Sequence, residues 1–226
     1  KTNHHKVIID TPELADSLED AMIARDCPGM ADVDSSYLLL FDKLKFDANT
    51  VLSGECSDEI FGGYPWYRDK DIRAINGFPW AQSTHYRKSF IKDDIKIPEA
   101  ENYVYARYKD TLINTSKING ISPLESRMKE MMKLNLDWFM QTLLDRKDRM
   151  SMYSGLEVRV PFADHRILEY VYNVPWEIKF ENGVEKALLR KAMKDWLPDK
   201  ILYRKKSPYP KTFDPKYFSM VSEKLR

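Results

Sequence analysis

The amino-acid sequence predicts an α/β fold in which helices dominate and a few strands run parallel. Residues 6–10 and 49–53 are read as strands. The second is brief, β-branched and bounded by polar residues, as expected of a strand buried on both faces. A helix start follows the first of them, where Thr11-Pro12-Glu13 places a cap, a proline and an acid in order. We therefore expect a sheet-containing part over residues 1–78 and a mainly helical part over residues 79–226.

Composition excludes several classes of protein. The 36 lysines and arginines nearly balance the 35 acids, so a net charge of +1 offers no electrostatic footprint for nucleic acid. The two cysteines, Cys27 and Cys56, are too few for a disulfide framework and lack the spacing of a metal site. No apolar run approaches the ~20 residues of a membrane span, and Lys1 opens no signal peptide. We expect a cytoplasmic protein with neither nucleic-acid nor membrane partners.

The most informative stretch covers residues 51–64, which read as a strand, a glycine turn and the start of a helix. Gly54 allows a sharp turn or the close approach of a ligand. Glu55, Asp58 and Glu59 then place three carboxylates within five residues, and like charges at helical spacing repel. A helix N-terminus relieves part of this repulsion, and a bound cation relieves more. The spacing fits both a nucleotide-metal site and a plain acidic helix start.

Apolar residues at helical spacing predict further helices. They cover residues 14–23, 37–44, 99–112, 123–136, 133–149, 165–172 and 185–196. Ser35 or Ser36 is expected to cap the second of these and Asp164 the sixth. Prolines after residue 207 predict an extended or turn-rich tail.

Residues 68–96 interleave aromatic and basic side chains, including Trp80, His85, Tyr86 and Phe90. Such a pattern can bind single-stranded nucleic acid. Because the net charge is nearly zero, we favour a helical core face covered by lysine stems.

Three segments, in the same order along the chain, resemble the synthetase domain of glutamine-hydrolysing asparagine synthetases. They are Ser-Gly-Glu-Cys-Ser-Asp-Glu-Ile-Phe-Gly-Gly-Tyr-Pro-Trp-Tyr at 53–67, residues 148–166 with Gly-Leu-Glu-Val-Arg-Val-Pro-Phe, and Gly-Val-Glu-Lys-Ala-Leu-Leu-Arg at 183–190. With residues 204–208 they span most of the chain and leave 68–132 without a match. The resemblance implies a partial parallel sheet of the adenine-nucleotide alpha-hydrolase, or ATP-pyrophosphatase, type.

The same resemblance implies that this chain is the C-terminal part of a synthetase domain. The family's Ser-Gly-Gly-x-Asp-Ser pyrophosphate loop has no counterpart here, because no glycine pair precedes Asp34-Ser35-Ser36. The N-terminal glutaminase domain with its catalytic cysteine is also absent. We expect the fragment alone not to complete catalysis. The family's threonine and arginine contacts to aspartate fall opposite Gly29, Met30 and Asp32, so they are not carried over.

The implied reaction activates aspartate with ATP as β-aspartyl-adenylate, releases pyrophosphate, and amidates the adenylate with ammonia derived from glutamine. By resemblance Asp58 is a Mg²⁺ ligand, since hard oxygen ligands suit that ion. Ser53 and Gly54 line the nucleotide pocket with Asp58 and Lys186. Glu55 is the general base, and Lys186 also stabilises developing negative charge.

Residues near the end of the 133–149 helix allow two interpretations. Asp145 and Arg149 are spaced as a solvated i, i+4 pair, whereas the resemblance implies that Asp148 and Arg149 face inward and shape the floor of the site. Arg190 is expected to be a structural partner of Lys186, on the same helix face.

Three other functions remain open. A relative that adenylates another carboxylate to form an amide or lactam would share the motifs. A catalytically silent binding module would keep the fold, although it has no need of repelling charges at Glu55 and Asp58. A nucleic-acid-binding domain is disfavoured by the net charge. The sequence leaves homodimer formation open.

Overall fold

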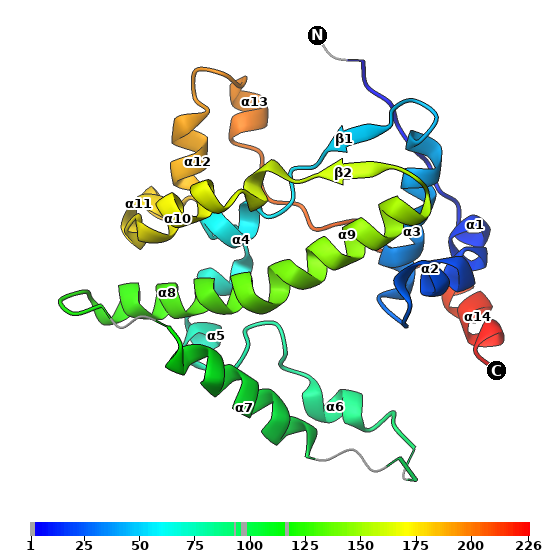
Figure 1. Cartoon of the computed structure of the whole chain (residues 1–226), viewed down its shortest axis with the longest axis horizontal. Helices are drawn as coiled ribbons and strands as arrows, with labels where there is room; N and C mark the ends of the chain where they lie inside the picture. Colours follow the sequence, from blue (N-terminus) through cyan, green and yellow to red (C-terminus); the bar gives the residue numbers. More distant parts are fainter. Residues whose placement is uncertain (1–2, 93, 96–98, 116–117) are drawn as a thin grey trace. The chain divides into compact units, whose positions relative to one another are not determined.

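The computed structural model describes residues 3–92, 94–95, 99–115 and 118–226 (Figure 1). The chain separates into two compact units, each assembled from discontinuous segments. The first unit contains residues 1–54, 142–161 and 206–226, and the second contains residues 55–141 and 162–205.

The first unit joins a small sheet to helices. Its elements are α1 (Thr11–Asp16), α2 (Leu18–Arg25), α3 (Ala31–Leu44), β1 (Thr50–Leu52), α9 (Gln141–Tyr153, from its second residue), β2 (Glu157–Arg159) and α14 (Pro215–Lys224). The strands β1 and β2 run parallel, and Val51 lies opposite Val158. Both valines pack against a core that contains Tyr37 and Phe41 of α3 and Met150 of α9. The parallel sheet and the predominance of helices confirm the predicted fold class.

The strand predicted at residues 6–10 is wrong. Residues 3–10 have no regular secondary structure, Ile8 is exposed, and its carbonyl accepts a hydrogen bond from Lys43 Nζ. A strand requires a neighbouring strand to complete its hydrogen bonds, and in the described part of the chain the sheet consists of β1 and β2. Asp10 instead caps α1 through its side chain, the role that the sequence assigned to Thr11.

Two helix starts also differ from the prediction. Helix α3 begins at Ala31, so Ser35 and Ser36 lie within it rather than at its cap. The tail ends in a helix, α14, which Asp214 caps and which Pro215 opens. Proline is tolerated in the first turn because its missing N–H has no partner there. Tyr217 of α14 packs with Leu14 and Ala15 of α1.

The second unit is almost entirely helical. Its α-helices are α4 (Ser57–Phe61), α5 (Lys70–Ala74), α6 (Thr84–Lys88), α7 (Ala100–Ile113), α8 (Pro123–Leu134), α10 (His165–Asn173), α11 (Trp176–Lys179), α12 (Ala187–Ala192) and α13 (Asp199–Leu202). Short helical segments are η1 (Pro65–Tyr67), the π-helix η2 (Asn135–Met140), η3 (Pro161–Ala163, at the boundary of the units) and η4 (Glu181–Gly183). The predicted helices at 99–112, 123–136 and 165–172 and the Asp164 cap are confirmed.

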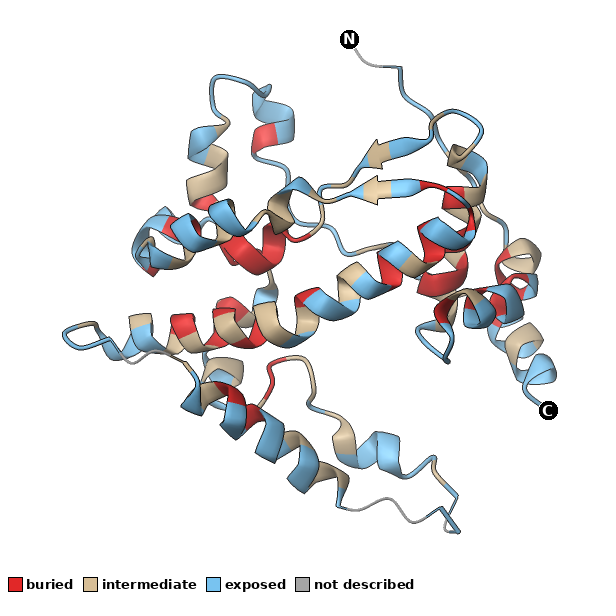
Figure 2. Ribbon diagram, in the orientation of Figure 1, coloured by how far each residue is buried: buried red, intermediate tan, exposed pale blue. Residues whose placement is uncertain are grey.

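Helix α4 lies at the centre of this unit. All five of its residues are buried (Figure 2), and Ile60 and Phe61 pack with Met132 and Val171. Next to it, Tyr67 stacks on Trp176 with ring centroids 5.2 Å apart. Burial on every side means that the charged residues of α4 depend on partners from the surrounding elements.

The predicted aromatic core face over residues 68–96 is only partly correct. Trp80 packs against the cluster of Phe78, Tyr108 and Leu134. Tyr86 and Phe90, however, are exposed and contact each other edge to face. A pattern of mixed aromatic and basic residues does not say which aromatic side chain joins a buried cluster. Among the described residues of this segment, Phe78 and Trp80 do so.

Lys179 of α11 is a buried cation with weak partners. The residue is 3% exposed, and its Nζ lies 3.5 Å from both the Tyr172 carbonyl oxygen and the Met132 sulfur. Burial, with a smaller contribution from the charge of Lys129, lowers the pKa of Lys179 from 10.5 to about 7. The charged lysine therefore opposes folding at neutral pH.

Replacing this lysine should stabilise the protein in a pH-dependent manner. Between pH 7 and pH 10.5 the unfolded chain holds a proton on Lys179 that the folded chain lacks, so stability rises with pH across this window. We expect Lys179→Met to raise the free energy of unfolding near pH 7 by up to about 4 kcal/mol. The gain should shrink towards pH 10.

Urea denaturation at pH 7 and pH 10 measures this effect, with Lys200→Met at an exposed lysine of α13 as the control. Equal changes in the two variants at both pH values would contradict the assignment.

Candidate functional site

The acidic stretch after β1 turns at Cys56 rather than at Gly54. Cys56 adopts a left-handed conformation, with φ +69°, and precedes the first residue of α4. Gly54 is exposed, and a Cβ placed there would meet nothing within 4 Å. The chain itself therefore leaves room for a side chain at Gly54, and the close approach of a ligand there stays a prediction. Ser53 and Gly54 end the first segment of the first unit, and Glu55 begins the second unit.

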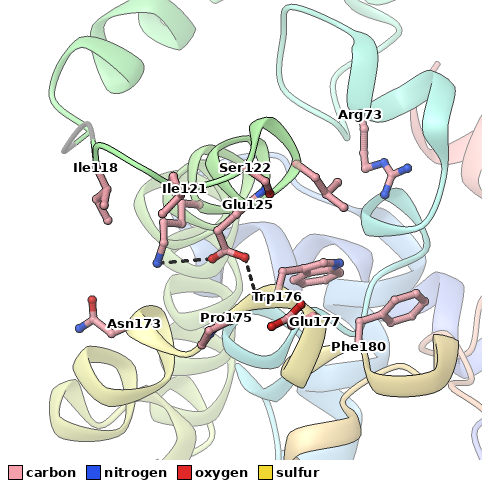
Figure 3. Close-up of a pocket in the computed structure, with 12 residues that line it drawn as sticks. Arg73, Ile118, Ile121, Ser122, Glu125, Asn173, Pro175, Trp176, Glu177 and Phe180 are labelled. Carbon is pink, nitrogen blue, oxygen red and sulfur yellow. Dashed lines mark hydrogen bonds and ion pairs between the residues drawn. The ribbon is translucent and has the colours of Figure 1, made fainter.

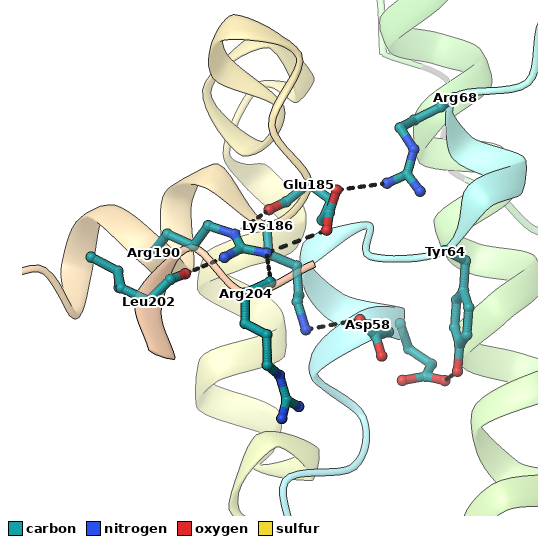
Figure 4. A network of polar contacts seen from close by, with 9 residues as sticks. Asp58, Tyr64, Arg68, Glu185, Lys186, Arg190, Leu202 and Arg204 are labelled. Atoms are coloured by element: carbon teal, nitrogen blue, oxygen red, sulfur yellow. Dashed lines mark hydrogen bonds and ion pairs between the residues drawn. The ribbon is translucent and has the colours of Figure 1, made fainter. Parts of the chain in front are cut away.

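Asp58 and Lys186 form an ion pair within the second unit (Figure 4). Lys186 Nζ lies 2.9 Å from Asp58 Oδ1, and the side chains are 20% and 12% exposed, respectively. Glu55, three residues before Asp58, is half-buried. Two residues far apart in sequence, both predicted to be functional, therefore come together.

Gly63 makes room for this carboxylate. A Cβ at Gly63 would lie 1.9 Å from Asp58 Oδ1, while the Gly63 N–H donates to the Asp58 carbonyl oxygen at 2.9 Å. The preceding Gly62 has φ +72°, and a Cβ there would meet the Trp176 ring at 2.5 Å. The glycine pair is thus required by close packing around Asp58 and Trp176.

Glu59 is the most deeply buried acid of the stretch, at 1% exposure. Burial, with smaller contributions from the charges of Asp58 and Glu55, raises the pKa of Glu59 to about 7, although a hydrogen bond from Tyr64 acts to lower it. The Tyr64 hydroxyl donates a short hydrogen bond to the Glu59 carboxylate. Tyr64 itself is held between aromatic rings, stacked on Trp66 at 4.2 Å. Each of these two neighbouring acids thus has its own partner, a cation for Asp58 and a hydroxyl for Glu59.

Lys186 lies outside the helix in which the sequence placed it. Helix α12 begins at Ala187, and Lys186 precedes it in a left-handed conformation with φ +55°. Lys186 and Arg190 therefore do not share a helix face as predicted. The helix also ends early, at Ala192, and Trp196 is exposed.

In the first unit, Ser53 contacts a lysine that the sequence analysis missed. Lys147 Nζ donates to Ser53 Oγ at 3.0 Å and lies 4.9 Å from the centre of the Tyr37 ring. Lys147 is only 6% exposed, whereas Asp148, predicted to face inward, is exposed. Arg149 instead pairs with Asp145 at 2.8 Å, which is the solvated alternative. The sequence pattern could have predicted that Lys147 is buried, because this lysine is three residues before the buried Met150 and shares its helix face.

Asp34 organises the loop over residues 26–30. Its carboxylate lies 3.6 Å from Arg25 Nη1 and 2.8 Å from Arg146 Nε, and accepts a hydrogen bond from the Met30 N–H. A Cβ at Gly29 would lie 1.9 Å from Asp34 Oδ2. Asp34 therefore acts as the buried anchor of this loop.

A pocket of about 680 Å³ lies elsewhere in the second unit, beside α8 and α11 (Figure 3). None of the predicted site residues lines it. Its central carboxylate, Glu125, accepts from the Trp176 N–H at 2.7 Å and lies 3.6 Å from Lys129 Nζ. These polar groups serve the start of α11 rather than an open binding surface.

Neither a metal cluster nor a membrane span is evident in the residues that the structure describes. Among them, no three His, Cys, Asp or Glu side chains are grouped as a metal site would require. Within the same residues, no helix combines the length and apolar character needed to cross a membrane. Cys27 is exposed and Cys56 is buried, and neither belongs to a disulfide in the described part of the chain.

Helices around a small parallel sheet, with an acidic helix start after β1, define a domain of the adenine-nucleotide alpha-hydrolase type. The family model for asparagine synthase matches residues 1–226, and the chain belongs to this family.

Curated relatives agree with this assignment. The chain is 51% identical over 226 residues to asparagine synthetase [glutamine-hydrolyzing] 3 of Bacillus subtilis (strain 168), covering 100% of this chain and 36% of the relative. It is 27% identical over 215 residues to asparagine synthetase [glutamine-hydrolyzing] of Gallus gallus, covering 92% of this chain and 29% of the relative. The chain thus spans about a third of the length of these relatives.

The close contact at Gly63 leads to a stability prediction. In Gly63→Ala the new methyl group must displace the Asp58 carboxylate, so we expect a loss of about 1–3 kcal/mol in the free energy of unfolding. Gly77→Ala is the matched control, because a Cβ there meets only Ile75 Cγ2 at 3.6 Å, an ordinary contact. Chemical denaturation compares the two variants, and equal stabilities would show that Asp58 moves aside without cost.

Proposed function

We propose that the full-length protein makes asparagine from aspartate, ATP and ammonia, and that this chain supplies part of its synthetase site. Membership in the asparagine synthase family supports the reaction class. The single observation that carries the site is the Asp58–Lys186 ion pair at the start of α4, beside Glu55. Because the relatives are named as glutamine-hydrolysing, we further propose that glutamine is the source of the ammonia.

The reaction has two steps. An oxygen of the aspartate β-carboxylate bonds to the α-phosphorus of ATP as the bond to pyrophosphate breaks. The nitrogen of ammonia then bonds to the acyl carbon of the adenylate. The bond from this carbon to the bridging oxygen breaks, and AMP leaves with that oxygen. A proton passes from the nitrogen to a base. The first step develops negative charge on the leaving group, and the second requires proton removal, so a cation and a carboxylate are needed close together.

The residues present fit a Mg²⁺ ion. This ion is bound through one or two carboxylates together with substrate phosphates and water, rather than by an all-protein cage. Asp58 offers a hard oxygen ligand in a largely buried position. When bound, Mg²⁺ would neutralise charge on the pyrophosphate.

Lys186 is proposed to stabilise the negative charge that develops on the phosphates. Its side chain is 20% exposed while it pairs with Asp58. Ser53 and Gly54 are proposed to line the nucleotide pocket. The buried Lys147 holds the Ser53 hydroxyl and adds a positive charge beside it, which favours a polyanionic ligand.

Glu55 is proposed to accept the proton released during amide formation. It is half-buried, at the turn before α4, and a carboxylate in a partly dry position can be tuned as a base. The neighbouring acids Asp58 and Glu59 are paired with Lys186 and Tyr64, respectively.

The direct test is pyrophosphate release from ATP and Mg²⁺ by the full-length protein, with and without aspartate. Release that requires aspartate supports the proposal. Release with a bulkier carboxylate but not with aspartate would indicate an amide- or lactam-forming relative instead. No release with any carboxylate would leave a binding module without catalysis.

Replacing the proposed base should separate the two steps. In Glu55→Gln of the full-length protein we expect amide formation to fall about 10²–10⁴-fold, because the proton acceptor is lost. Pyrophosphate release should change far less. The control Glu169→Gln alters an exposed acid of α10 and should affect neither step. Parallel losses in both steps would reject the assignment of Glu55 as a base.

A further inference from the structure

We infer that Arg190 is a positioning residue for the synthetase reaction, because it holds the backbone turn that places Lys186 on Asp58. The inference rests on the proposed function of Lys186. It concerns the guanidinium group of Arg190, whose hydrogen bonds reach the backbone carbonyl oxygens of Glu185, Leu202 and Arg204. The Arg190 side chain lies beside the Asp58–Lys186 pair in Figure 4 and is only 13% exposed.

The backbone at Lys186 needs support. Its φ of +55° is in the left-handed region, which side chains other than glycine rarely adopt. Left to local preference, this residue would join α12 in a right-handed conformation. Such a change would redirect the lysine side chain, so the ion pair depends on contacts that hold the turn.

Arg190 supplies those contacts directly. Its Nε donates to the Glu185 carbonyl oxygen at 2.8 Å. That carbonyl belongs to the peptide group that joins Glu185 to Lys186. The torsion φ of Lys186 describes how this peptide group is rotated about the N–Cα bond of Lys186. The guanidinium group therefore fixes the one torsion that makes Lys186 unusual.

The same guanidinium group ties the turn to a second segment. Its Nη2 donates to the Arg204 carbonyl oxygen at 3.0 Å, and its Nη1 donates to the Leu202 carbonyl oxygen at the end of α13. These acceptors, with the Glu185 carbonyl, occupy all three guanidinium nitrogens. A planar fork with several donors can hold such a set, whereas the point charge of lysine cannot.

The Glu185 side chain links the turn to the segment after α4. Its Oε1 lies 3.3 Å from Arg190 Nη2, and its Oε2 lies 3.4 Å from Arg68 Nη1. Arg68 follows directly after η1, a short distance along the chain from Asp58. The Glu185 carboxylate thus joins the turn before α12 to the end of η1.

A double-mutant cycle in the full-length protein tests the inference. The variants are Lys186→Ala, Arg190→Lys and their combination, and the measurements are kcat and KM for ATP in aspartate-dependent pyrophosphate release. We expect Arg190→Lys to lower kcat about 10²-fold, as a displaced catalytic group does. In the Lys186→Ala background the same change should cost nothing further, because the group that it positions is already gone.

A merely structural role predicts a different pattern. The effects of the two substitutions would then multiply, or Arg190→Lys would lower Tm while leaving kcat intact, and either result would overturn the inference. Lys191→Ala is the matched control, since this neighbour in α12 is largely exposed and pairs only with Glu181 among the ion pairs of the described chain. It should leave both kcat and Tm unchanged.

A structure of Arg190→Lys keeps the inference separate from the proposed function. We expect φ of Lys186 to become negative and the contact with Asp58 to be lost, whichever carboxylate the protein activates. Retention of a positive φ and of the 2.9 Å contact would overturn the positioning role. A wild-type protein that releases no pyrophosphate with aspartate would instead overturn the proposed function.

Discussion

The burial of charge in helix α4 is the constraint on which the second unit depends. Two acids, Asp58 and Glu59, lie in a five-residue helix that is buried along its whole length. A buried carboxylate is costly unless it gains a cation or strong hydrogen-bond donors. Lys186 provides the cation for Asp58, and Tyr64 provides the hydroxyl for Glu59. The left-handed turn at Lys186 and the close approach of Gly63 follow from these two requirements.

The first unit also contains buried charged side chains, but there the cations outnumber the acids. Asp34 is buried between Arg25 and Arg146, and Lys147 is buried over aromatic rings with its ammonium group on Ser53. These contacts join α2, α3 and α9 and hold the end of β1. In both units, charged side chains from distant segments thus fix the geometry of residues near the end of the strand. Charges that are fixed in this way need no rearrangement when a charged ligand binds or reacts.

Local patterns were sufficient for much of the fold. The strand at Val51, the helices α7, α8 and α10, and the Asp164 cap follow from apolar spacing and cap chemistry, which act within a few residues. Sequence patterns gave wrong predictions where the structure of a segment depends on contacts with a distant segment. The strand predicted at residues 6–10 has no partner strand in the described chain, and the aromatic residues Tyr86 and Phe90 have no core to enter.

The sequence alone determined the family resemblance, and it supplied the candidate site residues Glu55, Asp58 and Lys186, whose roles stay predictions. Only the tertiary structure decided that Asp58 pairs with Lys186, that Lys186 leaves the helix, and that Lys147 rather than Asp148 faces inward. The physical reason is that motifs record which charged groups are present. The partner of each buried charge is chosen by packing between segments that lie far apart along the chain.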